Sequence, residues 1–206
     1  MISLSLRERP LRQEDFPEEI CSGIDETFGL AGSLWPMMQS LADTLACKRE
    51  GQDVSGKARC LEQRLQSWSP DQAQASIDKS DVHMEAMLQI ARAYKYSSLL
   101  TLYSEISPRL GAEDQELLYK TYQSAFDSLL RTCVLSGPMS TLTWPLYTVA
   151  ILAESSGDQN VVQHIFSTLQ NRQHMKVVEM ASESVSFHWG SATLAPWDKE
   201  GAVFFG

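Results

Sequence analysis

The feature that most constrains the fold of this chain is a stretch without glycine or proline, from Asp78 to about Ser104. Apolar side chains recur along this stretch at helical spacing, which predicts one long helix. Its main face is formed by Met84, Met87, Leu88, Ala91, Tyr94, Ser98 and Leu102. Further apolar side chains lie off that face in the second half, at Ile90, Leu99, Leu100 and Tyr103. A helix that is apolar on several sides must be covered on several sides, so we expect it to run through the middle of the domain.

The remaining apolar patterns predict other helices and no strand. The first expected helix begins at Ser33. The others span about 58–68, 112–134, 146–153, 158–169 and 173–188. Ser33 and Asp158 are expected to cap two of them, with Pro36 in the first turn after Ser33. The stripe of the helix over 112–134 includes Tyr119. The sequence therefore predicts an all-α fold, a single compact domain of about six to seven helices around a long central helix.

The chain divides into three parts by composition. Residues 1–32 mix charges, prolines and glycines without periodicity and are expected to form an irregular arm. Residues 33–190 carry the helical patterns, and residues 191–206 form an apolar tail that includes Trp197 and Phe204. A length of 206 residues is enough for one substantial core, so we expect one domain.

The charge balance limits the class of partner. The chain has 17 basic and 26 acidic residues, a net charge of −9. Nucleic-acid binding needs a clustered basic surface, so we expect no direct contact with nucleic acid through this segment. No apolar run is long enough for a membrane span, and the first residues carry no signal-peptide pattern. These features predict an intracellular protein of the nucleus or cytoplasm.

The cysteines do not point to a metal or to disulfides. Cys21, Cys47, Cys60 and Cys133 are widely separated, and no histidine pair stands near them at metal-binding spacing. We expect buried, reduced thiols, no metal and no cofactor.

Motifs of catalysis are incomplete or missing. The segment from Gly51 to Ala58 follows the phosphate-loop pattern up to its last position, where alanine replaces the Ser or Thr that binds Mg²⁺. A polar loop between helices is the expected structure there. The sequence has no G-x-S-x-G elbow and no H-E-x-x-H motif, so we predict that the domain is not an enzyme.

Methionine and aromatic side chains are numerous for one helical domain. Core packing accounts for most of them, but the polar tips of tyrosine and tryptophan could orient an apolar guest in a pocket between helices. The candidate ligand-binding residues are Met38, Tyr96, Leu100, Tyr103, Trp144 and Tyr147.

Three segments carry a family resemblance. They are Phe28–Leu34 (FGLAGSL), the helix with Ala91, Tyr94, Ser97 and Tyr103, and the stretch from Thr143–Ala150 (TWPLYTVA) to Phe187-His188-Trp189. In order and spacing the chain resembles the regulatory domain of fungal-specific transcription factors. The resemblance implies an all-α domain that lies downstream of a binuclear zinc cluster and regulates genes. In the sterol-responsive branch the domain binds a lipid. The zinc cluster needs six closely spaced cysteines, so we expect it to be excised from this sequence or naturally absent.

Two functions follow as predictions. The first is a regulatory domain of a fungal transcription factor, which binds an apolar small molecule such as a sterol or lipid, or a protein partner, and controls transcription without touching DNA. The alternative is a helical scaffold without a ligand, which forms a homodimer or binds transcriptional coregulators.

Overall fold

The chain forms helices wherever its structure is described. A computed structural model describes residues 30–70, 82–106, 112–135 and 141–191. Within these ranges there are seven α-helices and no strand, which confirms the predicted all-α class. The helices are α1 (Trp35–Arg49), α2 (Ser55–Ser67), α3 (Val82–Thr101), α4 (Ala112–Val134), α5 (Thr143–Ile151), α6 (Ser156–Gln173) and α7 (Lys176–Ser191). The predicted N-terminal arm, apart from its last residues, and all but the first residue of the predicted tail lie outside the described residues.

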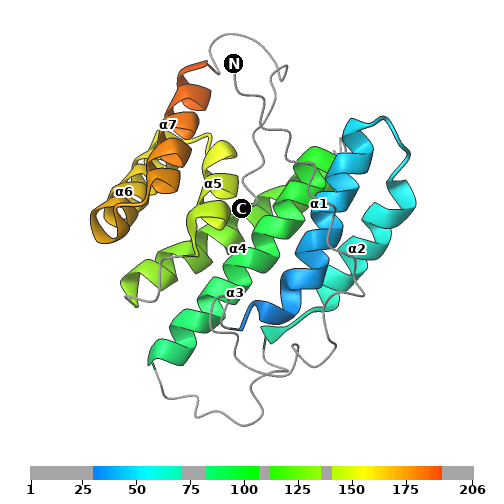
Figure 1. The fold of residues 1–206 in the computed structure, drawn as a ribbon, viewed down its shortest axis with the longest axis horizontal. Helices are drawn as coiled ribbons and strands as arrows, with labels where there is room; N and C mark the ends of the chain where they lie inside the picture. The colour runs from blue at the N-terminus through cyan, green and yellow to red at the C-terminus, as the bar shows by residue number, and fades with distance from the viewer. Residues whose placement is uncertain (1–29, 71–81, 107–111, 136–140, 192–206) are drawn as a thin grey trace, which may run out of the picture.

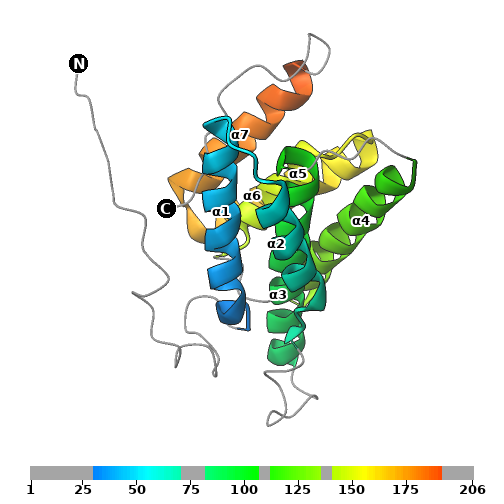
Figure 2. The ribbon, with the colours of Figure 1, turned by 90° about the vertical axis from the view of Figure 1, so that its right-hand side faces the viewer.

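Helix α3 lies at the centre of the arrangement. It packs along α4 and also contacts α2 and α5. In Figure 1, α1 and α2 lie on one side of the α3–α4 pair, and α5, α6 and α7 lie on the other. Figure 2 shows α1 and α2 side by side on the near face of the molecule. The long helix therefore has the central position that the sequence predicted.

The second half of α3 is buried on several sides, whereas Lys95 and Tyr96 remain partly exposed. Ile90, Leu99 and Leu100 are buried although they lie off the main apolar stripe, as predicted. The buried hydroxyls in this part have acceptors, since that of Ser98 donates to the carbonyl of Tyr94 and that of Ser97 donates to the carbonyl of Pro145. A π-helix, η5 (Leu102–Ile106), continues α3. The ammonium group of Lys48 on α1 donates to the carbonyl of Ile106 at 3.1 Å, so α1 holds the end of this central element.

The entry to α1 differs from the prediction. Pro36 lies in the first turn as expected, but Ser33 does not cap the helix. A 3₁₀ turn, η3 (Gly32–Leu34), precedes α1 and makes Leu34 the N-cap. The Ser33 hydroxyl instead accepts a hydrogen bond from the indole N–H of Trp68 at 3.0 Å. The prediction was wrong because a contact with a residue distant in sequence takes the hydroxyl that the local pattern assigned to the cap.

Two further details of the prediction need correction. Tyr119 is 60% exposed and does not belong to the buried stripe of α4. At 3.6 residues per turn it lies about 80° around the helix from the fully buried Leu129. The N-cap of α6 is Ser155, whose hydroxyl accepts from the backbone N–H of Asp158 at 3.0 Å. The carboxylate of Asp158 is therefore free to accept from the Tyr122 hydroxyl on α4, at 3.2 Å.

Candidate functional site

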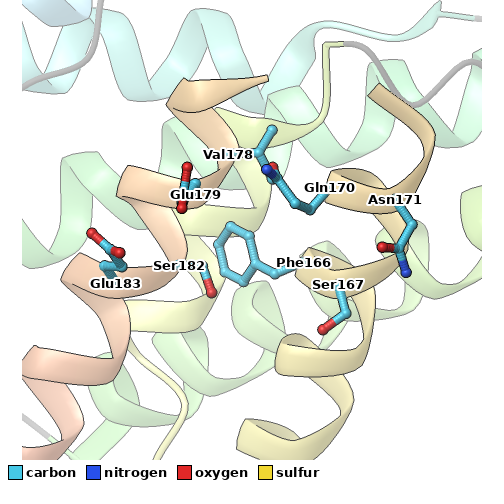
Figure 3. Close-up of a pocket in the computed structure, with 8 residues that line it drawn as sticks. All are labelled: Phe166, Ser167, Gln170, Asn171, Val178, Glu179, Ser182 and Glu183. Carbon is cyan, nitrogen blue, oxygen red and sulfur yellow. The ribbon is translucent and has the colours of Figure 1, made fainter. Parts of the chain in front are cut away.

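The described residues form a surface groove between α6 and α7, which we call the α6–α7 groove. It has a volume of about 260 Å³ (Figure 3). Its lining residues are Phe166, Ser167, Gln170 and Asn171 from α6, and Val178, Glu179, Ser182 and Glu183 from α7.

A tight connection sets the two helices of the groove side by side. His174 ends α6 in a left-handed conformation with φ of 50°, and its backbone N–H donates to the carbonyl of Gln170 at 2.8 Å. This is the αL type of helix ending, which reverses the chain within a few residues. Met175 completes the link to α7. The buried Ile165 and Leu169 of α6, and Ala181 and Val185 of α7, belong to the common core and fix the pair beneath the groove.

The groove has an apolar floor and acidic, polar walls. Phe166 is 1% exposed, and its ring lies between the two helices together with Val178 (Figure 3). The α7 wall carries the carboxylates of Glu179 and Glu183, and the lining residues include no lysine or arginine. Within the described part of the chain, neither carboxylate forms an ion pair.

The opposite wall adds an unused acceptor. The Gln170 side chain extends from α6 toward Val178 in Figure 3. Its Oε1 atom is shielded from solvent and accepts no hydrogen bond from the residues that the structure describes. A buried acceptor without a donor costs free energy. The two exposed carboxylates of the α7 wall make the groove suited to a group that brings hydrogen-bond donors and positive charge.

Beside the groove, α7 exposes large apolar side chains. Met180 is 44% exposed and Phe187 is 71% exposed. They are seven residues apart, so they lie on one face of the helix, and the exposed Glu183 lies between them along that face. We call the surface formed by Met180, Glu183 and Phe187 the outer face of α7.

Three of the six predicted ligand-binding residues lie in the packed core. Met38 on α1, Leu100 on α3 and Tyr103 on η5 are buried. The Tyr103 hydroxyl donates to the Glu62 carboxylate at 3.1 Å and accepts from the Gln66 side chain at 3.2 Å, both on α2. This hydroxyl is therefore satisfied inside the protein.

The other three predicted residues are half-buried. The Trp144 ring packs against Tyr94 with centroids 5.7 Å apart, and the Lys95 ammonium lies 5.9 Å from the centre of the Tyr96 ring. The Tyr147 hydroxyl lies 3.4 Å from the Ser184 hydroxyl of α7. Tyr103 thus faces α2 whereas Tyr147 faces α7. None of the six predicted residues lines the α6–α7 groove.

Sequence reasoning missed the groove and its residues. Glu179, Ser182 and Glu183 drew no attention because acids and serines on a helix usually face solvent. The available signal was that α7 carries Met180 and Phe187 outside its buried stripe.

The buried Tyr94 gives the fold a dependence on alkaline pH. Its hydroxyl donates to the backbone carbonyl of Thr141, and burial raises the pKa of Tyr94 to about 12. Burial, followed by the nearby Asp158, also raises the pKa of Tyr122. A folded state that holds a proton more tightly than the unfolded chain loses stability once the unfolded chain releases that proton.

We therefore expect the free energy of unfolding to fall as the pH rises from about 10, the ordinary tyrosine pKa, toward 12. One such proton contributes a slope of at most about 1.4 kcal/mol per pH unit. Tyr94→Phe should make the fall shallower, since it removes the titrating group from both states. Urea titrations of both proteins between neutral pH and pH 12 test this. Parallel curves for the two proteins would contradict it.

The cysteines differ in part from the expectation. Cys47, Cys60 and Cys133 are free thiols, but Cys60 is exposed and the other two are half-buried, so the prediction that they are buried was wrong. Cys60 lies on the solvent side of α2, outside its narrow apolar stripe. Among the described side chains, no three His, Cys, Asp or Glu residues gather in a way that could bind a metal ion. In the same ranges, each helix is too short or too polar to cross a lipid bilayer.

The fold and the groove define an all-α domain with a small acidic groove beside an exposed apolar helix face. A family model described as the fungal specific transcription factor domain matches residues 1–196. The chain belongs to this family. The domain therefore has a role in transcription regulation, and the family is in general not enzymatic. Searches of curated proteins and of solved structures gave no match to this chain.

Proposed function

We propose that this domain regulates transcription by docking another protein on the outer face of α7, without contacting DNA itself. The observation that supports the proposal is the exposure of Met180 and Phe187 on one face of the same helix. Exposed apolar side chains that share a face and border a groove are typical of protein interaction sites. Aromatic side chains such as Phe187 supply much of the contact area in such interfaces.

The charge of the chain supports the part of this proposal that excludes direct contact with DNA. With 17 basic and 26 acidic residues, the segment repels the phosphates of DNA, so DNA contact belongs to another segment or another protein. A coregulator is the partner class that fits a transcription regulator of this kind, and such a regulator acts in the nucleus.

Sedimentation equilibrium of the purified chain tests the predicted homodimer, which requires a doubled mass.

A reporter assay tests the docking role. The full chain is fused to an unrelated DNA-binding domain, and reporter output is measured for the original sequence and for Phe187→Ser. We expect output to change several-fold, since truncating a central aromatic anchor costs about 2 kcal/mol or more of binding. Circular dichroism should show an unchanged fold, because Phe187 is 71% exposed.

Tyr119→Ser is the matched control. Tyr119 is an exposed aromatic residue on α4, at 60% exposure, so its loss removes a similar surface from another helix. Its reporter output should equal that of the original sequence. Equal output from all three proteins would exclude the outer face of α7 as the docking surface.

The half-buried aromatic side chains favour a second candidate function, the sensing of a sterol or lipid. Tyr96, Trp144 and Tyr147 are partly accessible and carry polar tips. Together with Met38, Leu100 and Tyr103 they are the residues proposed to contact such a ligand. Mass spectrometry of the protein purified without denaturation tests this role. A lipid bound at one molecule per chain would support sensing, and a lipid-free protein with no thermal shift across a lipid panel would oppose it.

A further inference from the structure

We infer that the α6–α7 groove receives a lysine or arginine side chain of the docked protein, whose apolar residues lie on Met180 and Phe187. This inference rests on the proposed function, because it names the chemistry of the partner at the same face. The partner segment is a basic amphipathic helix.

The first argument for a basic occupant is the charge of the groove. Glu179 and Glu183 stand one helical turn apart on the same wall, and neither forms an ion pair within the described residues. A lysine or arginine head group brings several N–H donors and a positive charge, so it satisfies these groups together.

The second argument, for a single side chain as occupant, is the size of the groove. Its volume of about 260 Å³ lies below the range of about 300–1,000 Å³ that is typical of pockets for whole small molecules. A single long side chain fits this size better. Its methylene groups would lie on the apolar floor formed by Phe166 and Val178 while its head group reaches the carboxylates.

The third argument, for a helical partner, is the arrangement of side chains along α7. Glu179 and Glu183 line the groove, and Glu183 also lies on the outer face between Met180 and Phe187. Met180 and Phe187 are separated by about 10 Å along the helix axis, or two turns. A helix laid along α7 presents its own apolar residues at the same two-turn spacing, and a basic residue on its flank reaches the groove.

A second copy of this chain fits the face less well. An antiparallel α7–α7 pair that sets Met180 against Phe187 brings the two Glu183 side chains together near the two-fold axis. Like charges placed opposite each other across an interface oppose association. The acidic walls therefore favour a basic partner over self-pairing at this face.

Three synthetic peptides test the inference. Each is an amphipathic helix-forming sequence with apolar residues two turns apart, and they differ only at the flanking position, which is lysine, norleucine or glutamate. Binding to the full chain is measured by fluorescence anisotropy at low and at high salt. We expect the lysine peptide to bind about fivefold more tightly than the norleucine peptide and the glutamate peptide to bind least. Salt should reduce the lysine preference.

Paired substitutions assign the preference to the groove. The double variant Glu179→Gln, Glu183→Gln should bind the lysine and norleucine peptides equally. The matched control is Glu105→Gln, Glu154→Gln, which removes two exposed carboxylates from other parts of the chain and should keep the preference. A preference that survives in the groove variant would overturn the inference.

The outcomes separate the inference from the proposed function. Equal binding of the lysine and norleucine peptides, with weaker binding by Phe187→Ser, would overturn the basic occupant and leave the docking face in place. A lysine preference that is lost in the groove variant but unaffected by Phe187→Ser would support the basic occupant and overturn the role of the outer face. Absence of binding by all three peptides would overturn both.

Discussion

Tyr103→Ala is expected to lower the free energy of unfolding by about 3–5 kcal/mol, the usual cost of deleting a buried aromatic ring. Tyr103 is 4% exposed and belongs to the common core. Its removal leaves a cavity beside η5 and takes the hydroxyl partner from Glu62 and Gln66. Because small domains are stable by only about 5–15 kcal/mol, this loss is a large share of the total.

Urea denaturation followed by circular dichroism measures this loss, and two variants separate its causes. Tyr103→Phe keeps the ring and removes only the hydroxyl, so it should cost about 1 kcal/mol. Tyr96→Ala removes a half-buried ring and should cost less than Tyr103→Ala. An unchanged stability of Tyr103→Ala would contradict its core position and would favour its assignment to a ligand cavity. Ligand-binding tests at this position should therefore use phenylalanine, which keeps the domain folded.

The helices could be predicted from the sequence because their patterns are local and strong. The stretch that became α3 lacks glycine and proline and is apolar on several sides, which requires a central position. A proline also marked the start of a helix, since Pro36 lies in the first turn of α1.

The caps could not be predicted with the same success, because a hydroxyl has more than one available partner. Ser33 accepts from Trp68, which is 35 positions away in the sequence. The hydroxyl of Ser155 caps α6. The carboxylate of Asp158, three positions later, instead accepts a hydrogen bond from the Tyr122 hydroxyl of α4. Local rules rank candidates for a cap, but the tertiary contacts of each side chain decide among them.

The groove was beyond sequence reasoning for a related reason. Its lining combines two residues from the cores of α6 and α7, Phe166 and Val178, with polar residues from the edges of the same helices. Each helix alone shows an ordinary amphipathic pattern. The groove exists only because the ending at His174 sets the two edges beside each other. The aromatic residues chosen from the sequence lie elsewhere, as Trp144 beside Tyr94 illustrates.

Phe166→Ala should destabilise the domain as strongly as the change at Tyr103. Among the residues that the structure describes, Phe166 has the largest fully buried side chain, and its ring forms the floor of the groove between α6 and α7. We expect a loss of about 3–5 kcal/mol in the free energy of unfolding, since the ring leaves a cavity that the two helices can fill only by moving together.

Two neighbouring variants turn this loss into a test of the groove. Phe166→Leu keeps an apolar floor and should cost about 1–2 kcal/mol, whereas Ser167→Ala, at an exposed position on the rim, should change stability by less than about 0.5 kcal/mol. Urea denaturation measures all three. Because Phe166→Leu leaves Glu179 and Glu183 in place, it should still bind the lysine peptide more tightly than the norleucine peptide. Equal costs for Phe166→Ala and Ser167→Ala would show that the ring does not support the α6–α7 pair, and the groove would lose its structural basis.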